Sequence, residues 1–386
     1  MSNIYGGRGL EIVSGEGALV RDSSGKTHID FLCGNGSALF GHCHPVLTEA
    51  ALKAVRSPWT ISPGLVSEAR DSFRKTLASL LPADQKDQKN KAFVCNSGTE
   101  AMEAALKLAV ALRPGRKKII ALRRAFHGRT MGSLALTFNP QYRKAWAEIL
   151  MPVTHVAPAD VPSVVDEETA AVFIEPVQGE GGVHVLDAAQ GKAITKACRD
   201  AGAILAVDEI QSGWGRCGSL LASSQTGLEP DIVALAKGLA GGLPVGAVIW
   251  KEDLGDFPAK GHGSTYGGNP VASSVGLVAW DLLHSEGYPQ RAVESGVFFA
   301  SRLSALKSPL IREVRHMGLL FGVEVSVKAD PIVKELQERG VLALNAGPQV
   351  VRFLPPFTAK EEHFSLVAET LGEVLEAHEK YGKMET

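Results

Sequence analysis

The sequence predicts an α/β fold whose parallel sheet is buried on both faces, followed by a smaller α+β domain. First, short continuous apolar runs alternate with helical patterns in the middle of the 386-residue chain. Runs without polar alternation are typical of strands covered by helices on both sides. Second, polar residues follow several of these runs, at the sheet edge where α/β proteins bind ligands. Third, the pattern changes near Pro270 to amphipathic helices and isolated strands.

Six apolar runs are the predicted strands of the central sheet. They cover residues 92–95, 118–122, 170–174, 203–207, 232–235 and 245–250. A helix rich in alanine and leucine is predicted over 100–112. The last third predicts helices at 274–284, 291–306 and 360–380 and strands at 318–325 and 350–353. Apolar residues at helical spacing predict that the last helix packs by one face.

Composition and charge exclude several classes of protein. The formal net charge is −2, which gives no electrostatic basis for binding nucleic acid or an anionic membrane. The five cysteines are widely spaced and form no C-x-x-C, so we expect neither a disulfide framework nor structural zinc, but a reducing cytoplasm. The N-terminus lacks the apolar stretch of a signal peptide. The longest apolar stretch, 238–250, is too short to span a bilayer and contains Pro244.

The segment Asn96–Glu100 lies between a predicted strand and the 100–112 helix. Ser97 and Glu100 form the S-x-x-E pattern of a capping box. Gly98 permits close backbone approach, and a helix N-terminus offers free N–H groups to an anion such as phosphate. The alternative interpretation is an ordinary capped helix.

Two residues at strand ends carry further chemistry. Asp208 follows the 203–207 run, where a buried acid needs a partner such as a protonated heterocyclic nitrogen. Asp208 could instead cap the next helix. Lys237 follows the 232–235 run, and burial there would lower the pKa of its amine and allow Schiff-base formation. The alternative is a lysine whose ammonium reaches solvent.

Two glycine-containing loops are further candidates. Phe126–Thr130 offers an aromatic face and Arg129, whose guanidinium could hold a carboxylate in bidentate fashion. Read alone, the segment favours an arginine exposed on a surface loop. Gly263–Pro270 could add hydroxyl donors to a phosphate, or could simply be a turn.

Other catalytic patterns are weak or missing in the sequence. His42 and His44 form an H-x-H pair, but no acidic and histidine partners with helical spacing accompany it, so we expect no metal site. The glycines at 34–36 and 238–246 do not continue as G-x-G-x-x-G, which argues against a dinucleotide site. No G-x-S-x-G occurs, which argues against a serine hydrolase.

Together, these features describe a site for pyridoxal phosphate. That coenzyme needs an amine for its aldehyde, an anion for its pyridinium nitrogen and N–H donors for its phosphate. Lys237, Asp208 and the start of the 100–112 helix would supply the three.

The motifs resemble those of the class III aminotransferases of fold type I, in the acetylornithine aminotransferase branch. The resemblance runs from about Gly7 to about Phe357. It rests on Asn96–Glu100, Phe126–Thr130, Glu175–Gly182, Asp208–Gln211, Lys237–Gly238, Gly263–Pro270 and Arg352–Pro356, in that order. The compact length and the opening Tyr5–Leu10 also resemble enzymes that act on lysine or ornithine bound to the small acidic carrier protein LysW.

The resemblance implies a fold and an assembly. The large domain, residues 51–269, would hold a mostly parallel seven-stranded sheet between helices. Residues 270–386 would form the small domain, which the N-terminal segment 1–50 joins. The family's active sites are shared in a homodimer, in which Thr265 would reach the phosphate of the neighbouring subunit's cofactor and Ser264 would lie near the substrate.

The resemblance also implies residue roles. Lys237 would condense with the coenzyme aldehyde and shuttle the proton of the substrate, while Asp208 would keep the pyridine nitrogen protonated. Arg129 would bind the substrate carboxylate. The other cofactor contacts would be Gly98, Thr99, Phe126, Glu209, Ile210 and Gln211.

Glu180 and Arg352 resemble the pair by which this family accepts both a basic ω-amino substrate and glutamate. The pair would be closed for the ω-amine, and Glu180 would swing away to free Arg352 for the glutamate carboxylate. The segments 35–40 and 59–64 lack the tyrosines with which ornithine δ-aminotransferases hold a free α-amino group. This departure implies an α-amine blocked by an acetyl group or a carrier peptide.

The resemblance therefore implies transfer of the terminal amino group between an N-blocked ornithine or lysine and 2-oxoglutarate, in arginine or lysine biosynthesis. Within the same fold, the alternatives are an ornithine δ-aminotransferase and a glutamate-1-semialdehyde aminomutase. From other classes, they are a metal hydrolase built on His42 and His44 and a regulator that binds pyridoxal phosphate without turnover.

Overall fold

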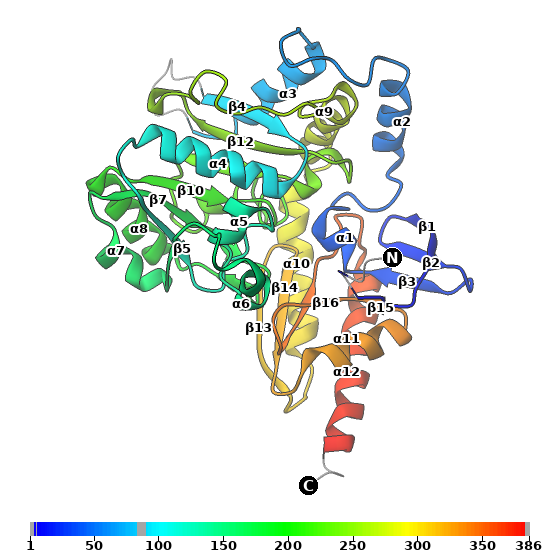
Figure 1. Ribbon diagram of the computed structural model, residues 1–386. Helices are drawn as coiled ribbons and strands as arrows, with labels where there is room; N and C mark the ends of the chain where they lie inside the picture. The colour runs from blue at the N-terminus through cyan, green and yellow to red at the C-terminus, as the bar shows by residue number, and fades with distance from the viewer. Residues whose placement is uncertain (1–3, 5, 83–89, 383–386) are drawn as a thin grey trace.

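A seven-stranded mixed sheet lies at the centre of the part of the chain that the computed structural model describes, residues 4, 6–82 and 90–382 (Figure 1). Its strand order is β4 (Asn90–Cys95), β12 (Gly246–Lys251), β11 (Ile232–Leu235), β10 (Ile204–Asp208), β7 (Thr169–Ile174), β5 (Lys118–Leu122) and β6 (Thr154–Val156). The six predicted runs are all strands of this sheet, and the predicted fold class is confirmed. The sequence did not predict β6, because its three residues form no continuous apolar run.

β12 is the one strand of this sheet that runs opposite to the other six, and it is antiparallel to both of its neighbours, β11 and β4. The physical reason is the short connection from β11, residues 236–245. A parallel crossover needs a dozen or more residues, so this segment can only reverse the chain. The reversal begins with Lys237, in the 3₁₀ turn η4 (Lys237–Ala240).

Helices cover both faces of the sheet, which explains the continuous apolar runs. On β10, Ile204 and Ala206 belong to the core formed with α4 (Gly98–Leu112). The alternate residues Leu205 and Val207 belong to the core beneath α8 (Ala188–Ala201). Because successive side chains of a strand point to opposite faces, both sets must be apolar.

Two smaller sheets join the ends of the chain. β1 (Ile12–Glu16), β2 (Leu19–Asp22) and β3 (Thr27–Asp30) pair with β15 (Val341–Leu342), which is parallel to β3. The other sheet has the order β13 (Ile311–Met317), β14 (Leu320–Val325), β17 (Val350–Phe353) and β16 (Leu344–Asn345). The N-terminal strands thus lie beside C-terminal elements, as Figure 1 shows. The boundaries at residues 50 and 269 stay predictions.

The C-terminal helices are α9 (Pro270–Ser285), α10 (Tyr288–Ser304), α11 (Ala329–Glu338) and α12 (Glu361–Gly382). The three predicted helices are confirmed, although α9 begins earlier because Asn269 caps it and Pro270 occupies its first turn. The predicted strand 318–325 begins at Leu320, since Gly318 adopts a positive φ in the turn after β13. The sequence did not predict β13 and α11.

The remaining elements are short or lie near the N-terminus. They are α1 (Cys33–Gly36), α2 (Pro45–Ala54), α3 (Glu68–Ala78), α5 (Met131–Leu136), α6 (Pro140–Arg143), α7 (Val161–Val164), β8 (Val177–Gln178), β9 (His184–Val185) and the 3₁₀ turns η1 (Lys144–Trp146), η2 (Pro158–Asp160), η3 (Ala222–Ser224) and η5 (Glu252–Leu254). Among the described residues, no helix has the length and apolarity needed to cross a bilayer.

Candidate active site

A cavity of about 2110 Å³ opens at the carboxyl ends of β7 and β10. Its lining combines the start of α4, the loop 124–130, the β8–β9 hairpin and the turn η4. Arg352 of β17 and Asn35 of α1 close it from the other side. Ten of the predicted site residues line it: Gly98, Thr99, Phe126, Arg129, Glu180, Asp208, Ile210, Gln211, Lys237 and Arg352. Segments far apart in the sequence thus meet in one place.

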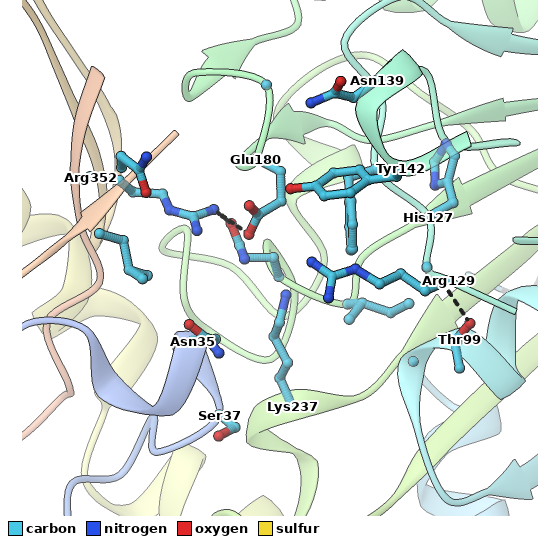
Figure 2. A pocket seen from close by; sticks show the side chains of 18 of the residues that line it. Asn35, Ser37, Thr99, His127, Arg129, Asn139, Tyr142, Glu180, Lys237 and Arg352 are labelled. Atoms are coloured by element: carbon cyan, nitrogen blue, oxygen red, sulfur yellow. Dashed lines mark hydrogen bonds and ion pairs between the residues drawn. The ribbon is translucent and has the colours of Figure 1, made fainter. Parts of the chain in front are cut away.

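Lys237 extends into this cavity from the start of η4, and Figure 2 shows its amine directed toward Arg129 and Glu180. Its φ is 51°, a left-handed conformation that is costly for a residue with a side chain. Burial lowers the pKa of its amine to about 8. No hydrogen bond or ion pair holds this amine within the described part of the chain. The geometry therefore favours a reactive amine over one that reaches bulk solvent.

Asp208 is the last residue of β10 and is only 5% exposed. Its Oδ2 lies 2.8 Å from Nδ1 of His127, and its Oδ1 accepts the backbone N–H of Ile210 at 3.0 Å. The carboxyl group thus has a buried polar partner on one side and faces the cavity. His127 was not predicted as a site residue, although the Phe126–Thr130 motif contains it.

A second buried acid, Glu175, follows the neighbouring strand β7 and also lines the cavity. Its Oε2 accepts the backbone N–H of Phe126 at 3.0 Å. Burial and the nearby Asp208 raise the pKa of this carboxyl well above its ordinary value. Glu175 was not predicted as a site residue, although it follows an apolar run of the sequence as Asp208 does.

The start of α4 has the geometry of an anion cradle. Ser97 accepts the N–H of Glu100 at 3.3 Å, as a capping box requires. Glu100 reaches back one residue further than predicted, to the N–H of Asn96 at 2.9 Å. Gly98 admits no side chain, because a Cβ there would lie 2.9 Å from Cγ2 of Ile210.

Arg129 extends along the cavity from the loop after β5 (Figure 2). Its guanidinium carbon lies 4.8 Å from the ring centroid of Tyr142 and 5.8 Å from that of Phe126. Stacking on aromatic rings orients a guanidinium without consuming its donors. Tyr142, which the sequence did not predict, is therefore part of the support of Arg129.

Glu180 and Arg352 form an ion pair of 2.7 Å between Oε1 and Nη1 (Figure 2). Arg352 is 2% exposed, and its Nη1 also donates to Oε1 of Gln211 at 3.2 Å. Burial alone would raise the pKa of Glu180, but the charge and hydrogen bond of Arg352 hold it below its ordinary value. The Nε of Arg352 is buried and has no partner within the described residues.

Three predicted site residues lie outside the cavity. The carboxylate of Glu209 is buried and accepts bonds from Ser212 and from the N–H of Ser223, so it supports the loop after β10. Ser264 and Thr265 line a separate surface hollow with residues 60–63. Ser264 accepts a bond from the Asn96 amide at 3.0 Å, which ties this loop to the start of α4.

The H-x-H pair has other partners. Nε2 of His42 lies 2.7 Å from Oδ2 of Asp30, and Nε2 of His44 lies 3.4 Å from the hydroxyl of Tyr288. Within residues 4, 6–82 and 90–382, no group of three His, Cys, Asp or Glu side chains could hold a metal ion.

The cavity residues fit pyridoxal phosphate. The partnerless amine of Lys237 suits an aldehyde, and the buried carboxyl of Asp208 suits a ring nitrogen. The start of α4, where Ser97, Gly98 and Thr99 line the cavity, suits a phosphate. The cavity therefore contains candidates for the three groups that the coenzyme needs: an amine, an anion for the ring nitrogen and N–H donors for the phosphate.

Comparison with known proteins gives consistent results. The family described as Aminotransferase class-III matches residues 7–375 of the chain. An acetylornithine aminotransferase of Mycobacterium tuberculosis is 40% identical over 366 residues, 94% of this chain and 90% of the relative. A LysW-aminoadipate semialdehyde transaminase of Deinococcus radiodurans is 37% identical over 381 residues, 97% and 88% of the two chains.

Among solved structures, the chain is similar to the ornithine aminotransferase of Toxoplasma gondii, which is described with partial occupancy of PLP at its active site. The TM-score is 0.92 at 30% sequence identity, with 99% of this chain and 93% of that chain covered. The similarity thus extends over the large sheet and both small sheets.

Proposed function

Because the chain belongs to the class III aminotransferases, a family that uses pyridoxal phosphate, we propose that it moves the terminal amino group of an N-blocked ornithine or lysine. The acceptor is 2-oxoglutarate, and glutamate is the donor in the biosynthetic direction. Relatives named acetylornithine aminotransferase and LysW-aminoadipate semialdehyde transaminase support this substrate class. The setting is arginine or lysine biosynthesis in the cytoplasm.

The observation that carries the proposal is the ion pair between Glu180 and Arg352 beside the amine of Lys237. An enzyme that accepts a basic ω-amine and an acidic amino acid at one site needs a cation that can be masked. Glu180 masks Arg352 in this structure. The partnerless Nε of Arg352 leaves a donor for a second carboxylate when Glu180 moves away.

The residues around the coenzyme position divide the work. Bound pyridoxal phosphate supplies an aldehyde and an electron-withdrawing ring. Lys237, whose pKa burial lowers to about 8, would supply the amine for the aldehyde and would carry the proton of the substrate carbon. Asp208, held by His127, keeps the ring nitrogen protonated, while Gly98 and Thr99 present the start of α4 to the phosphate. Phe126, Ile210 and Gln211, which also line the cavity, would supply the remaining contacts to the coenzyme, with Phe126 as the aromatic partner of its ring.

Arg129 is the proposed site for the α-carboxylate of the N-blocked substrate. Its guanidinium stacks on Tyr142 and lines the same cavity as Lys237. Asn35 and Ser37 line the cavity where the sequence has no tyrosine to hold a free α-amine. A cavity of about 2110 Å³ also leaves room for an acyl group or a carrier peptide on that amine.

The proposed assembly is a homodimer with shared active sites. The hollow that contains Ser264 and Thr265 is also lined by Tyr266, which is 61% exposed, and by Thr60, whose neighbour in the chain, Trp59, is 62% exposed. An exposed apolar cluster of this kind is typical of a surface that another chain covers. The partner's coenzyme phosphate would then meet Thr265, and Ser264 would lie near the substrate.

The deciding experiment compares acetylornithine, free ornithine and LysW-linked lysine as donors to 2-oxoglutarate with the purified holoenzyme. We expect one of the two N-blocked donors to exceed free ornithine in kcat/KM. A preference for free ornithine would favour the ornithine δ-aminotransferase alternative, for which the Toxoplasma structure is the supporting similarity. Lack of turnover with 2-oxoglutarate would favour an aminomutase.

A further inference from the structure

The loop that carries Glu180 connects β8 to β9 and is tightly confined. The N–H of Val183 donates to the carbonyl of Gln178 at 2.8 Å, which closes the loop. A Cβ at Gly181 would lie 2.6 Å from the carbonyl oxygen of Arg124, so the backbone itself is packed against a neighbouring segment. The position of Glu180 is therefore determined by where this loop is held.

Val183 fixes the loop to the sheet that contains Arg352. It has a φ of 58°, a strained conformation for a β-branched residue, and is fully buried. Its Cβ is so close to β14 that a Cβ on Gly322 would lie 2.9 Å from it. Gly322 is directly opposite Arg352 in the β14–β17 pairing. The loop that carries Glu180 and the strand that carries Arg352 are therefore both held by the β14–β17 pair.

Arg315 of β13 makes the second attachment. Its Nε and Nη2 both donate to the carbonyl oxygen of Gly182, at 3.1 and 2.9 Å. Its Nη1 contacts the carboxylates of Glu313 and Glu324, and the side chain is largely buried. The two acids orient the guanidinium, so the bonds to Gly182 are made by a group with little freedom.

We propose that Arg315 is a positioning residue that clamps the Glu180 loop to the strands carrying Arg352, and so sets the balance between the closed and open ion pair. The inference rests on the proposed function, in which the closed pair serves the ω-amine and the open pair serves glutamate. With the clamp in place, Glu180 leaves Arg352 by rotating its side chain. Without it, the loop gains backbone freedom in the open state, and the closed pair loses population.

The test measures both half-reactions of the holoenzyme by stopped-flow absorbance, with acetylornithine and with glutamate as donors. In Arg315→Met, the ratio of kcat/KM for acetylornithine to that for glutamate is expected to fall on the order of tenfold, the effect of about one hydrogen bond. Arg315→Lys, which keeps the charge but not the paired donors, should give a smaller fall. The matched control is Arg312→Met, an exposed arginine on the same strand, which should leave the ratio unchanged.

A merely structural role for Arg315 would lower both half-reactions together and leave their ratio at the wild-type value, and this result would overturn the proposal. Should Arg315→Met fail to fold, Arg315→Lys carries the same test. The ratio in the double variant Arg315→Met with Glu180→Ala should equal that of Glu180→Ala alone, because the clamp acts through Glu180. An additional fall in the double variant would also overturn the clamp.

The same ratio distinguishes a failure of the proposed Glu180–Arg352 switch from a failure of the Arg315 clamp. If Glu180→Ala alone leaves the ratio unchanged, the ion pair does not discriminate between the two donors. If Glu180→Ala changes the ratio but neither Arg315 variant does, the switch stands and only the clamp is wrong.

Discussion

The buried imidazole of His127 places its Nδ1 2.8 Å from Oδ2 of Asp208, while the other oxygen of Asp208 accepts the N–H of Ile210. Both side chains are almost inaccessible to solvent. This contact orients the acid that is proposed to hold the ring nitrogen of the coenzyme. In the proposed site, His127 would therefore act on the coenzyme through Asp208.

Replacing His127 should weaken coenzyme binding. His127→Ala leaves a buried carboxyl without its partner, and the loss of a hydrogen bond to a charged group costs about 1.5–3 kcal/mol. We expect the Kd for pyridoxal phosphate to rise on the order of tenfold to a hundredfold. His127→Asn, which can donate from a similar position, should restore part of this loss. Equal Kd values for the wild type and His127→Ala in fluorescence titrations would refute the expectation.

Reconstitution of the coenzyme-free protein should depend on pH through Lys237. The pKa of this amine is lowered to about 8, so half of the amine is neutral and nucleophilic near pH 8, and this fraction approaches its plateau only about one to two pH units higher. The second-order rate constant for pyridoxal phosphate binding should follow the same curve when absorbance is recorded at several pH values. Borohydride reduction followed by peptide mapping should place the pyridoxyl group on Lys237, and a label on Lys251 alone would contradict the assignment.

Gly98→Ala should disturb the anion cradle without unfolding α4. The new Cβ would lie 2.9 Å from Ile210, and such overpacking typically costs about 1–3 kcal/mol. We expect weaker binding of pyridoxal phosphate and a lower kcat/KM. Ile210→Ala should relieve the collision, so the double variant should bind the coenzyme more tightly than Gly98→Ala. Additive losses in the double variant would argue against this contact as the cause.

The surface around Thr265 should govern assembly. Tyr266→Asp places a charge in the proposed interface, where Tyr266 is 61% exposed in one chain. The variant should sediment as a monomer and lose activity, because each site of the proposed dimer would need the partner's loop. Val297→Asp is the control, since Val297 is similarly exposed but lies on α10. If Tyr266→Asp dimerises over the same range of protein concentration as the wild type, this surface is not the dimer interface.

The central sheet was predictable because its strands are buried on both faces and leave apolar runs in the sequence. The prediction of a mostly parallel sheet did not say which strand is antiparallel. The short 236–245 connection between β11 and β12 implies that it is β12. β13 was missed because Arg312, Glu313 and Arg315 interrupt its apolar pattern, and β6 was missed because it is too short.

The sequence indicates cavity residues most directly where a polar residue follows an apolar run, and Asp208 and Lys237, predicted in this way, both line the cavity. It missed His127 and Tyr142, whose roles depend on tertiary contacts with Asp208 and Arg129 that no local pattern specifies. Glu209 was carried over with its motif, but the alternation of side chains after β10 turns it away from the cavity. Adjacent residues of one motif can thus serve opposite sides of a loop.

The reversal of the chain between β11 and β12 has a consequence for the protein without its coenzyme. Each of these strands is hydrogen-bonded along both edges, so local opening near η4 would require rupture of the middle of the sheet. Amide hydrogens flanking η4 should therefore exchange with deuterium about as slowly as the most protected amides of the molecule. Loss of coenzyme and loss of fold would then be separate events, and heated, cofactor-depleted enzyme should recover activity on simple readdition.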